Sequence, residues 1–316
     1  MNNAFYSTPD PYYQFDVDKQ TDSLRTALTS KHSTSNLIRL ITQLTSSQRQ
    51  QIKTHYISAY GESLEKLISN KLSGDFRDCV IALFDSPTTF AAKQIFKAID
   101  GAGTDEDTLT EIIATRAPHT FTQLKTEYQS AYNETLKQAI EGDTSGDYLQ
   151  LLLALIEGGR NDNAYPNETA CSSMCELLHS KADTKEKECF MKVLVMYSPA
   201  EVAMIARMYM KKYKQSLKDV VEKVYKGDAK LLVGTLVESL VNPSRYFATR
   251  IRKAVDCFSV KSKIVIRVIV SRNEIDMQQI KRWYKRMYKS DMVDDIKKKL
   301  KGDFMELILA LCNKQH

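Results

Sequence analysis

A short motif returns four times along this chain of 316 residues: a glycine followed by an aspartate, with a run of apolar residues after them. The motif glycines are Gly74, Gly146, Gly227 and Gly302, at steps of 72, 81 and 75 residues. A pair of tyrosines precedes each of these glycines: Tyr56 and Tyr60, Tyr128 and Tyr132, Tyr209 and Tyr213, Tyr284 and Tyr288. Self-similarity at a near-constant period is the signature of a repeat architecture. The sequence therefore predicts four copies of one unit, each of about 70–75 residues.

The spacing of apolar residues within the copies is helical. Leu37, Leu40, Ile41 and Leu44 lie at relative positions 0, 3, 4 and 7, which places them on one face of an α-helix. Only 11 glycines and 7 prolines occur in the whole chain, too few for a turn-dense β protein. The prediction is an all-α protein with about five short helices in each repeat.

The repeats also divide the chain into parts. The longer middle step between glycines coincides with a polar stretch, Glu157–Pro166, which is typical of a linker. The first residues, rich in Asn, Pro and Tyr, show no helical period and are predicted to form an irregular tail. The predicted organisation is a tail over 1–17, repeat 1 over 18–86, repeat 2 over 87–158, a linker over 159–170, repeat 3 over 171–242 and repeat 4 over 243–316.

One connection between helices, Ala98–Glu106, carries Gly101 and Gly103 just before a predicted helix start. Glycine accepts positive φ, so these two positions let backbone carbonyls turn inward. Thr104 is predicted to cap the following helix, with Asp107 as the acidic member of a capping box. Inward carbonyls and one distant carboxylate form a hard oxygen site, which suits Ca²⁺. An ordinary connection between two helices is the alternative.

Several motifs together resemble those of one protein family. The segment Gly101–Glu106, followed by the Leu-x-x-Ile-Ile-x-x-Arg pattern of Leu109–Arg116, resembles the annexin repeat. The Ala-Tyr-Gly end of a tyrosine helix at 59–61 and the Gly-Asp motif resemble it too, and residues 267–276 resemble the final annexin repeat. The resemblance covers residues 18–316 and implies four five-helix repeats in a slightly curved disc. The departures from the family pattern resemble those of the annexin-like giardins of flagellate parasites.

The resemblance implies one calcium site, in repeat 2. The family holds Ca²⁺ with three carbonyls of the glycine loop and with a carboxylate three residues before the repeated glycine. The implied ligands are the carbonyls of Ile99, Gly101 and Gly103 and the carboxylate of Asp143. A secondary site would combine the Thr104 carbonyl with Glu106. The family usually has glutamate where Asp143 stands, so a shorter reach and weaker binding are expected; a solvated loop acid is the alternative.

The other three repeats lack this carboxylate. The corresponding residues are Lys71 in repeat 1, Val224 in repeat 3 and Lys299 in repeat 4. A valine or an ammonium group is no ligand for a hard cation. Their loops also lack the paired glycines. One complete calcium site is therefore predicted where the family can hold four.

Lysines in the degraded loops suggest a second mode of binding. Lys71 and Lys299 stand where a ligand carboxylate would be, and Lys31 and Lys181 lie in loops without the glycines. Each basic residue near an acidic leaflet contributes roughly 1 kcal/mol, and salt screens this attraction. The four lysines are predicted to contact lipid headgroups directly, and simple solvation of unused loops is the alternative.

Two other classes of function have little support. The five histidines are scattered, and the chain has no nucleophile elbow, phosphate-binding loop or dinucleotide fingerprint, so an enzyme is not expected. Residues 281–289 interleave basic and aromatic side chains, as in proteins that bind nucleic acid. However, Ile280, Trp283, Tyr284 and Met287 share one helical face, which predicts that the aromatic rings face the core. No nucleic-acid partner is expected.

The remaining features bear on location and partners. The start of the chain lacks a signal pattern, no apolar run approaches 18 residues, and the six cysteines show no paired framework. We therefore expect a cytoplasmic protein that docks peripherally on the inner face of acidic phospholipid membranes, with Ca²⁺ as cofactor. The net charge of +6 permits an acidic partner. A calcium-independent scaffold that binds a cytoskeletal protein is the alternative, and a homo-oligomer on the membrane stays open.

Overall fold

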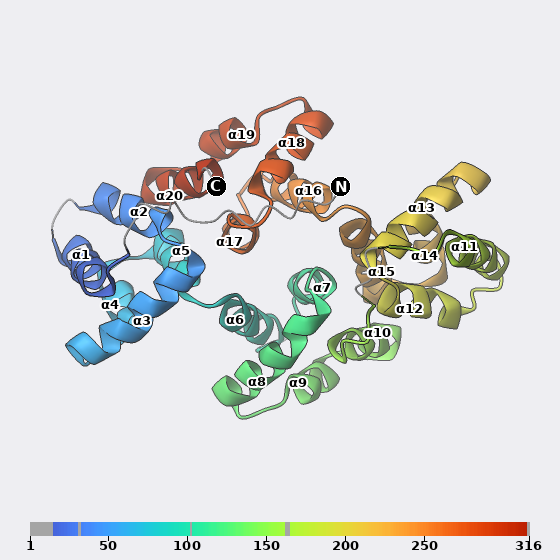
Figure 1. Cartoon of the computed structure of the whole chain (residues 1–316), viewed down its shortest axis with the longest axis horizontal. Helices are drawn as coiled ribbons and strands as arrows, with labels where there is room; N and C mark the ends of the chain where they lie inside the picture. The colour runs from blue at the N-terminus through green and yellow to red at the C-terminus, as the bar shows by residue number, and fades with distance from the viewer. Residues whose placement is uncertain (1–14, 31–32, 102, 162–164, 315–316) are drawn as a thin grey trace. The chain divides into compact units, whose positions relative to one another are not determined.

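The computed structural model describes residues 15–30, 33–101, 103–161 and 165–314. Within these ranges the chain forms twenty α-helices and one short 3-10 helix, η1 (Pro118–Thr120), and no strand (Figure 1). The all-α prediction is confirmed, and all six cysteines are free thiols. None of the described helices is both long and apolar enough to cross a bilayer.

The helices form four successive sets of five, as the repeats predict. Repeat 1 contains α1 (Val17–Thr29), α2 (Thr34–Gln43), α3 (Ser46–Tyr60), α4 (Leu64–Lys71) and α5 (Gly74–Phe84). Repeat 2 contains α6 (Pro87–Ile99), α7 (Glu106–Ala114), α8 (Phe121–Tyr132), α9 (Leu136–Asp143) and α10 (Gly146–Ile156). Repeat 3 contains α11 (Glu168–Ala182), α12 (Lys187–Met196), α13 (Pro199–Tyr213), α14 (Leu217–Val224) and α15 (Gly227–Val241). Repeat 4 contains α16 (Pro243–Val255), α17 (Ser262–Arg272), α18 (Met277–Tyr288), α19 (Met292–Lys299) and α20 (Gly302–Asn313).

Each repeated glycine is the first residue of the fifth helix in its repeat. These glycines are Gly74, Gly146, Gly227 and Gly302, with φ of +60°, +61°, +53° and +61°. A residue with a Cβ is strained at such angles, so glycine permits the sharp turn from the fourth helix into the fifth. The residues three positions earlier, Lys71, Asp143, Val224 and Lys299, end the fourth helices. The turn therefore determines where the residue at the carboxylate position of each repeat lies.

The first tyrosine of each pair lies in the hydrophobic core of its repeat. These residues are Tyr56, Tyr128, Tyr209 and Tyr284, and their exposed fractions are 0%, 1%, 0% and 0%. Three of their hydroxyl groups meet a polar side chain from the first helix of the repeat. The partners are Arg25 for Tyr56 at 3.2 Å, His179 for Tyr209 at 3.0 Å and Arg252 for Tyr284 at 3.4 Å. The periodic tyrosines thus mark helix packing, since a buried hydroxyl needs a partner.

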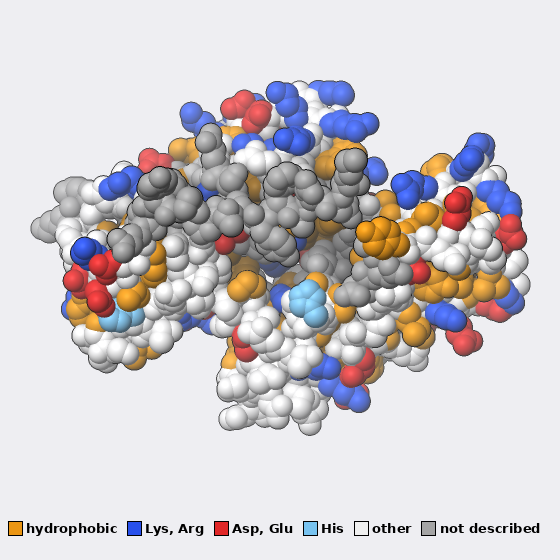
Figure 2. Space-filling model, in the orientation of Figure 1, with side chains coloured by type: hydrophobic (Ala, Val, Ile, Leu, Met, Phe, Trp, Pro, Cys, Tyr) orange, Lys and Arg blue, Asp and Glu red, His pale blue; other side chains and the backbone are white. Residues whose placement is uncertain are grey.

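The aromatic stretch of α18 is only partly in the core. Ile280 and Tyr284 are fully buried, as predicted. Trp283 and Met287 are half-buried, and the guanidinium of Arg286 lies 5.1 Å from the centre of the Trp283 ring. The prediction that the aromatic rings face the core is therefore confirmed for Tyr284 and only in part for Trp283, which lies at the edge of the buried face. Lysine and arginine side chains gather over α18 and α19 in Figure 2.

The chain packs as two compact units. One comprises the described residues up to Pro87 together with those from Phe247 onward, and the other comprises Thr88–Tyr246. In the first unit α2 and α5 of repeat 1 pack against α20 of repeat 4, and α5 also packs against α17. In the second unit α15 packs against α7 and α10. Repeats 1 and 4 therefore share one core, and repeats 2 and 3 share another.

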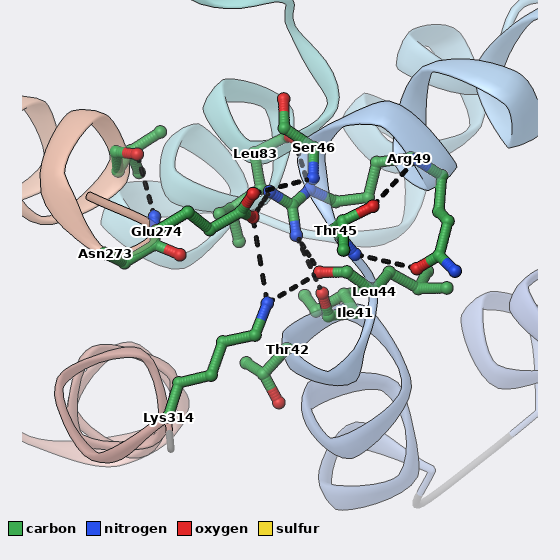
Figure 3. A network of polar contacts seen from close by, with 12 residues as sticks. Ile41, Thr42, Leu44, Thr45, Ser46, Arg49, Leu83, Asn273, Glu274 and Lys314 are labelled. Atoms are coloured by element: carbon green, nitrogen blue, oxygen red, sulfur yellow. Dashed lines mark hydrogen bonds and ion pairs between the residues drawn. The ribbon is translucent and has the colours of Figure 1, made fainter. Parts of the chain in front are cut away.

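A buried ion-pair network joins repeats 1 and 4 within the first unit (Figure 3). The Arg49 side chain is 3% exposed; it donates to Glu274 Oε1 at 2.7 Å and to the Leu83 carbonyl at 2.8 Å. Glu274 Oε2 accepts the Ser46 amide at 3.0 Å, and Lys314 Nζ lies 3.7 Å from Oε1. Burial alone would raise the pKa of Glu274, but the Arg49 charge, the Ser46 amide and Lys314 together hold that pKa below its usual value.

Candidate functional site

The glycine loop of repeat 2 connects α6 to α7. Gly101 and Gly103 have φ of +132° and +99°, a backbone conformation that other residues rarely adopt. A Cβ atom at either glycine would meet no other atom within 4 Å, so the requirement for glycine is conformational. The Asp105 amide donates to the Ala98 carbonyl at 2.7 Å and so closes the loop on the end of α6. The loop is therefore a defined turn.

The N-cap of α7 is Asp105, and the prediction that Thr104 caps this helix is wrong. Asp105 Oδ1 accepts the Thr108 amide at 3.0 Å, and Asp105 Oδ2 accepts the Thr108 hydroxyl at 2.7 Å. The helix begins one residue later than predicted, at Glu106. Both Thr and Asp are good caps, and here the carboxylate makes two hydrogen bonds at the helix start. The Thr104 side chain is left to make a different contact.

Thr104 links the glycine loop to Asp143. Its hydroxyl donates to Asp143 Oδ2 at 2.8 Å and lies 3.1 Å from the Asp143 carbonyl oxygen. Asp143 is the last residue of α9, so this contact joins segments 39 residues apart. The structure thus brings the predicted carboxylate to the predicted loop. This hydrogen bond was not predicted, although the threonine directly after the second glycine is a signal for it.

The other predicted residues of repeat 2 lie around the same loop. Ile99 ends α6 and is 9% exposed, whereas Gly101 and Gly103 are exposed. Glu106 begins α7, its carbonyl accepts the Tyr148 hydroxyl at 3.2 Å, and its carboxylate makes no hydrogen bond or ion pair within the described chain. Burial raises the pKa of Tyr148, which keeps this hydroxyl protonated as a donor. The start of α7 is therefore fixed against α10.

The donor set of this loop fits a hard cation. The described residues contain no group of three His, Cys, Asp or Glu side chains that could hold a metal ion. The predicted site needs only one carboxylate, since main-chain carbonyls would supply the other protein oxygens. Oxygen-only sets of this kind suit Ca²⁺, while Zn²⁺ prefers nitrogen and sulfur. The loop and Asp143 therefore match calcium better than a softer metal.

The corresponding positions in the other repeats carry different chemistry. Val224 is buried at the end of α14, and Lys71 and Lys299 are exposed at the ends of α4 and α19. Lys181 lies in the last turn of α11 and not in a loop, and it pairs with Glu186 at 2.7 Å, so its charge is already matched within repeat 3. Lys31 lies outside the described residues. Among the predicted lipid-contacting lysines, Lys71 and Lys299 therefore carry charge that no described side chain neutralises.

Comparison with known proteins identifies the repeat. A family model described as annexin matches residues 22–83, 90–155, 175–236 and 246–311. The chain belongs to the annexin family. Annexin A1 of Bos taurus is 30% identical over 98% of this chain and 90% of its own length. Annexin A13 of Homo sapiens is 29% identical over 94% of this chain and 95% of its own length.

Solved annexin structures share the fold. Annexin III matches with a TM-score of 0.91 at 26% identity, covering 97% of each chain. A calcium-bound annexin (Sm)1 matches with a TM-score of 0.87 at 20% identity, covering 96% of this chain and 92% of its own. A calcium-bound alpha-14 giardin matches with a TM-score of 0.83 at 20% identity, covering 95% of this chain and 100% of its own. The four five-helix sets are thus annexin repeats.

The conformational demand on Gly103 gives a direct test of the annexin loop. Gly103→Ala is expected to raise the calcium concentration for half-maximal vesicle binding about tenfold, because alanine at this φ costs about 1–3 kcal/mol and favours another loop conformation. Calcium titration of vesicle co-sedimentation measures this. Gly159→Ala is the control, since Gly159 has no positive φ and equal free space. An unchanged titration for Gly103→Ala would mean that the loop takes no part in binding.

Proposed function

We propose that this annexin binds acidic phospholipid membranes in a calcium-dependent manner through the glycine loop of repeat 2. The observation that carries the proposal is the hydrogen bond between Thr104 and Asp143, since it holds a carboxylate from the end of α9 beside the loop. The carbonyls of Ile99, Gly101 and Gly103 and the carboxylate of Asp143 would hold Ca²⁺. A weaker second site would use the Thr104 carbonyl and Glu106.

The chemistry of such a site explains its dependence on both metal and lipid. Bound Ca²⁺ offers coordination positions that the protein does not fill, and phosphate oxygens of a headgroup suit them. The role of the loop is to present its carbonyls from a preset turn, and the role of Asp143 is to supply negative charge. Lipid and protein then each increase the affinity of the other for the ion, by the same factor.

One calcium site gives a modest affinity, so other contacts are needed for firm attachment. Lys71 and Lys299 would add salt-sensitive contacts with headgroups, each worth roughly 1 kcal/mol near an acidic surface. Lys31 and Lys181 would contribute in the same way, the latter only when its ion pair with Glu186 opens. Multivalent attachment would convert these weak contacts into avidity. The protein would act peripherally, on the inner face of cellular membranes.

Vesicle co-sedimentation of the wild-type chain tests the proposal. Binding to vesicles of phosphatidylserine and phosphatidylcholine is expected in Ca²⁺, with a large reduction in chelator and with pure phosphatidylcholine. Binding that is equal in Ca²⁺ and chelator would contradict a calcium bridge. Co-sedimentation with cytoskeletal filaments in chelator, without vesicle binding, would instead favour a calcium-independent scaffold.

A further inference from the structure

A groove in the first unit brings lysines of repeats 1 and 4 together. Its volume is about 660 Å³. It is lined by residues from the ends of α4 and α19, the starts of α5 and α20, and the approaches to α2 and α17. The charged lining residues are Lys71, Lys299, Lys301, Asp75 and Asp303, and the hydroxyl-bearing ones are Thr34, Ser73, Ser259 and Ser262.

The charged side chains that line this groove are unpaired within the described part of the chain. The side chains of Lys71, Lys299 and Lys301 make no hydrogen bond or ion pair with any described residue, and neither do those of Asp75 and Asp303. The starts of α5 and α20 also receive no side-chain cap, because the Ser73 hydroxyl accepts no hydrogen bond there and the Lys301 ammonium group has no acceptor. Main-chain N–H groups at both helix starts thus remain available to an acceptor. The groove offers positive donors and two carboxylates to the same ligand.

The second unit contains a related groove in which a lysine and an aspartate form an ion pair. Asp147 follows its repeated glycine just as Asp75 and Asp303 follow theirs. It lies 2.6 Å from Lys187 Nζ, and both residues line a groove of only about 190 Å³. A lysine and an aspartate therefore neutralise each other there. The lysines and aspartates that line the groove of the first unit do not pair with one another. Their charges are therefore available to an external charged group.

An exposed aromatic residue next to the groove indicates a lipid surface as the source of the ligand. Phe258 lies in the loop between α16 and α17, and its exposed fraction is 109%, the highest of any large apolar residue described. The next two residues, Ser259 and Val260, line the groove. An exposed phenyl group is unfavourable in water and favourable at the boundary between headgroups and acyl chains. A soluble phosphate compound would give Phe258 no such environment.

We propose that this groove binds the headgroup of an aminophospholipid directly, without calcium. The phosphate would be bound by Lys71, Lys299 and Lys301, and the ammonium group by Asp75 and Asp303, while Phe258 enters the lipid. A headgroup that carries both signs matches the lining better than a purely anionic one, because the two carboxylates repel a lone phosphate. The inference rests on the proposed function only in taking an acidic membrane as the target.

Charge reversal in the groove tests the inference in the absence of calcium. The double variant Lys71→Glu with Lys299→Glu is compared with Lys285→Glu with Lys297→Glu, which changes the net charge equally at exposed positions outside the groove. In chelator, with phosphatidylserine vesicles at low salt, the groove variant is expected to lose about tenfold in affinity and the control less than threefold. Equal losses would mean that only net charge matters and would overturn the site.

Two further arms identify the ligand. Vesicles of phosphatidylglycerol carry the same charge without an ammonium group, and weaker wild-type binding to them is expected; equal binding would overturn the aminophospholipid assignment. Phe258→Ser is expected to weaken vesicle binding in chelator severalfold. Retained binding in this variant, together with displacement from vesicles by inorganic phosphate, would point to a soluble phosphate ligand and would overturn the lipid source.

The outcomes also separate this inference from the proposed calcium function. A groove effect in chelator, with no stimulation of wild-type binding by calcium, would leave the inference standing and contradict the proposed function. Calcium-stimulated binding with no effect of the groove variant in chelator would support the proposed function and overturn the inference.

Discussion

Asp143→Ala is expected to raise the calcium concentration for half-maximal binding to phosphatidylserine vesicles about a hundredfold or more, or to abolish calcium-dependent binding. Asp143 is the carboxylate that Thr104 joins to the glycine loop, through a hydrogen bond of 2.8 Å. Even outer-shell changes weaken metal affinity by about 10–100-fold, so the loss of a charged ligand should cost at least as much. Co-sedimentation across a calcium titration measures the effect.

Two further variants separate the charge of Asp143 from its structural role. Asp143→Asn retains an oxygen that can accept the Thr104 hydroxyl but removes the negative charge, so it should lose calcium response while keeping the thermal unfolding midpoint. Glu141→Ala is the control, since Glu141 lies on the same helix and pairs only with Lys137, at 3.8 Å. A wild-type calcium titration for both Asp143 variants would contradict a site in repeat 2.

Glu274→Ala is expected to destabilise the first unit by about 3 kcal/mol, the lower end of the range for breaking a buried ion pair, because Arg49 is buried but the Glu274 side chain is 26% exposed. Arg49 is 3% exposed and would keep its charge among main-chain carbonyls, and the Ser46 amide would lose its acceptor. The midpoint of urea-induced unfolding measures the loss. Glu274→Gln should cost less, because its one amide oxygen can still accept one of the two hydrogen bonds that the carboxylate oxygens accept from Arg49 and the Ser46 amide.

The same network predicts a loss of stability in acid. The folded-state pKa of Glu274 is lower than its usual value, so the folded state favours the ionised carboxylate. The resulting stability is fully present above the unfolded-state pKa and is lost as the pH falls through the folded-state pKa. The wild type should therefore lose stability on acidification, and Glu274→Ala should lose less over the same range. Parallel losses in the two proteins would contradict this role.

An exposed ion pair supplies the control for both experiments. Glu176 and Lys212 lie 2.6 Å apart, with side chains 58% and 52% exposed. Solvent screens such a pair, so Glu176→Ala should leave the unfolding midpoint nearly unchanged. A shift as large as that of Glu274→Ala would mean that burial does not distinguish the two pairs.

Local pattern was enough to predict the helices. The paired tyrosines and the Gly-Asp motif both depend on contacts within one repeat, so they recur at a readable period. The choice of Asp143 as a ligand came from the annexin resemblance, which implies a carboxylate three residues before the repeated glycine, and the structure has Asp143 as the last residue of the fourth helix. The cap of α7 was not predictable in this way, since Thr104 and Asp105 are both suitable caps and only the Asp143 contact distinguishes them.

The groove of the first unit could not be found from local pattern at all. Lys71 and Lys299 belong to different repeats, and the sequence predicts separate headgroup contacts for them, not a shared groove. Their common lining of one cavity arises from the packing of α5 against α17 and α20, which no spacing in the sequence encodes. Lys181 shows the opposite case, because its pairing with Glu186 depends on a loop conformation that the sequence does not specify.

The division of the chain between its two units has a consequence for synthesis on the ribosome. Thr88–Tyr246 is one continuous segment, so it can fold as soon as it emerges. The other unit joins segments that are far apart in the sequence. Glu274, for example, is synthesised 225 residues after its partner Arg49. Until then α2 lacks its packing partner α20, and α5 lacks its partners α17 and α20, so their apolar faces are uncovered. The helices of repeat 1 are therefore synthesised first but should complete their packing last. Until then they are the segments to which a chaperone would bind.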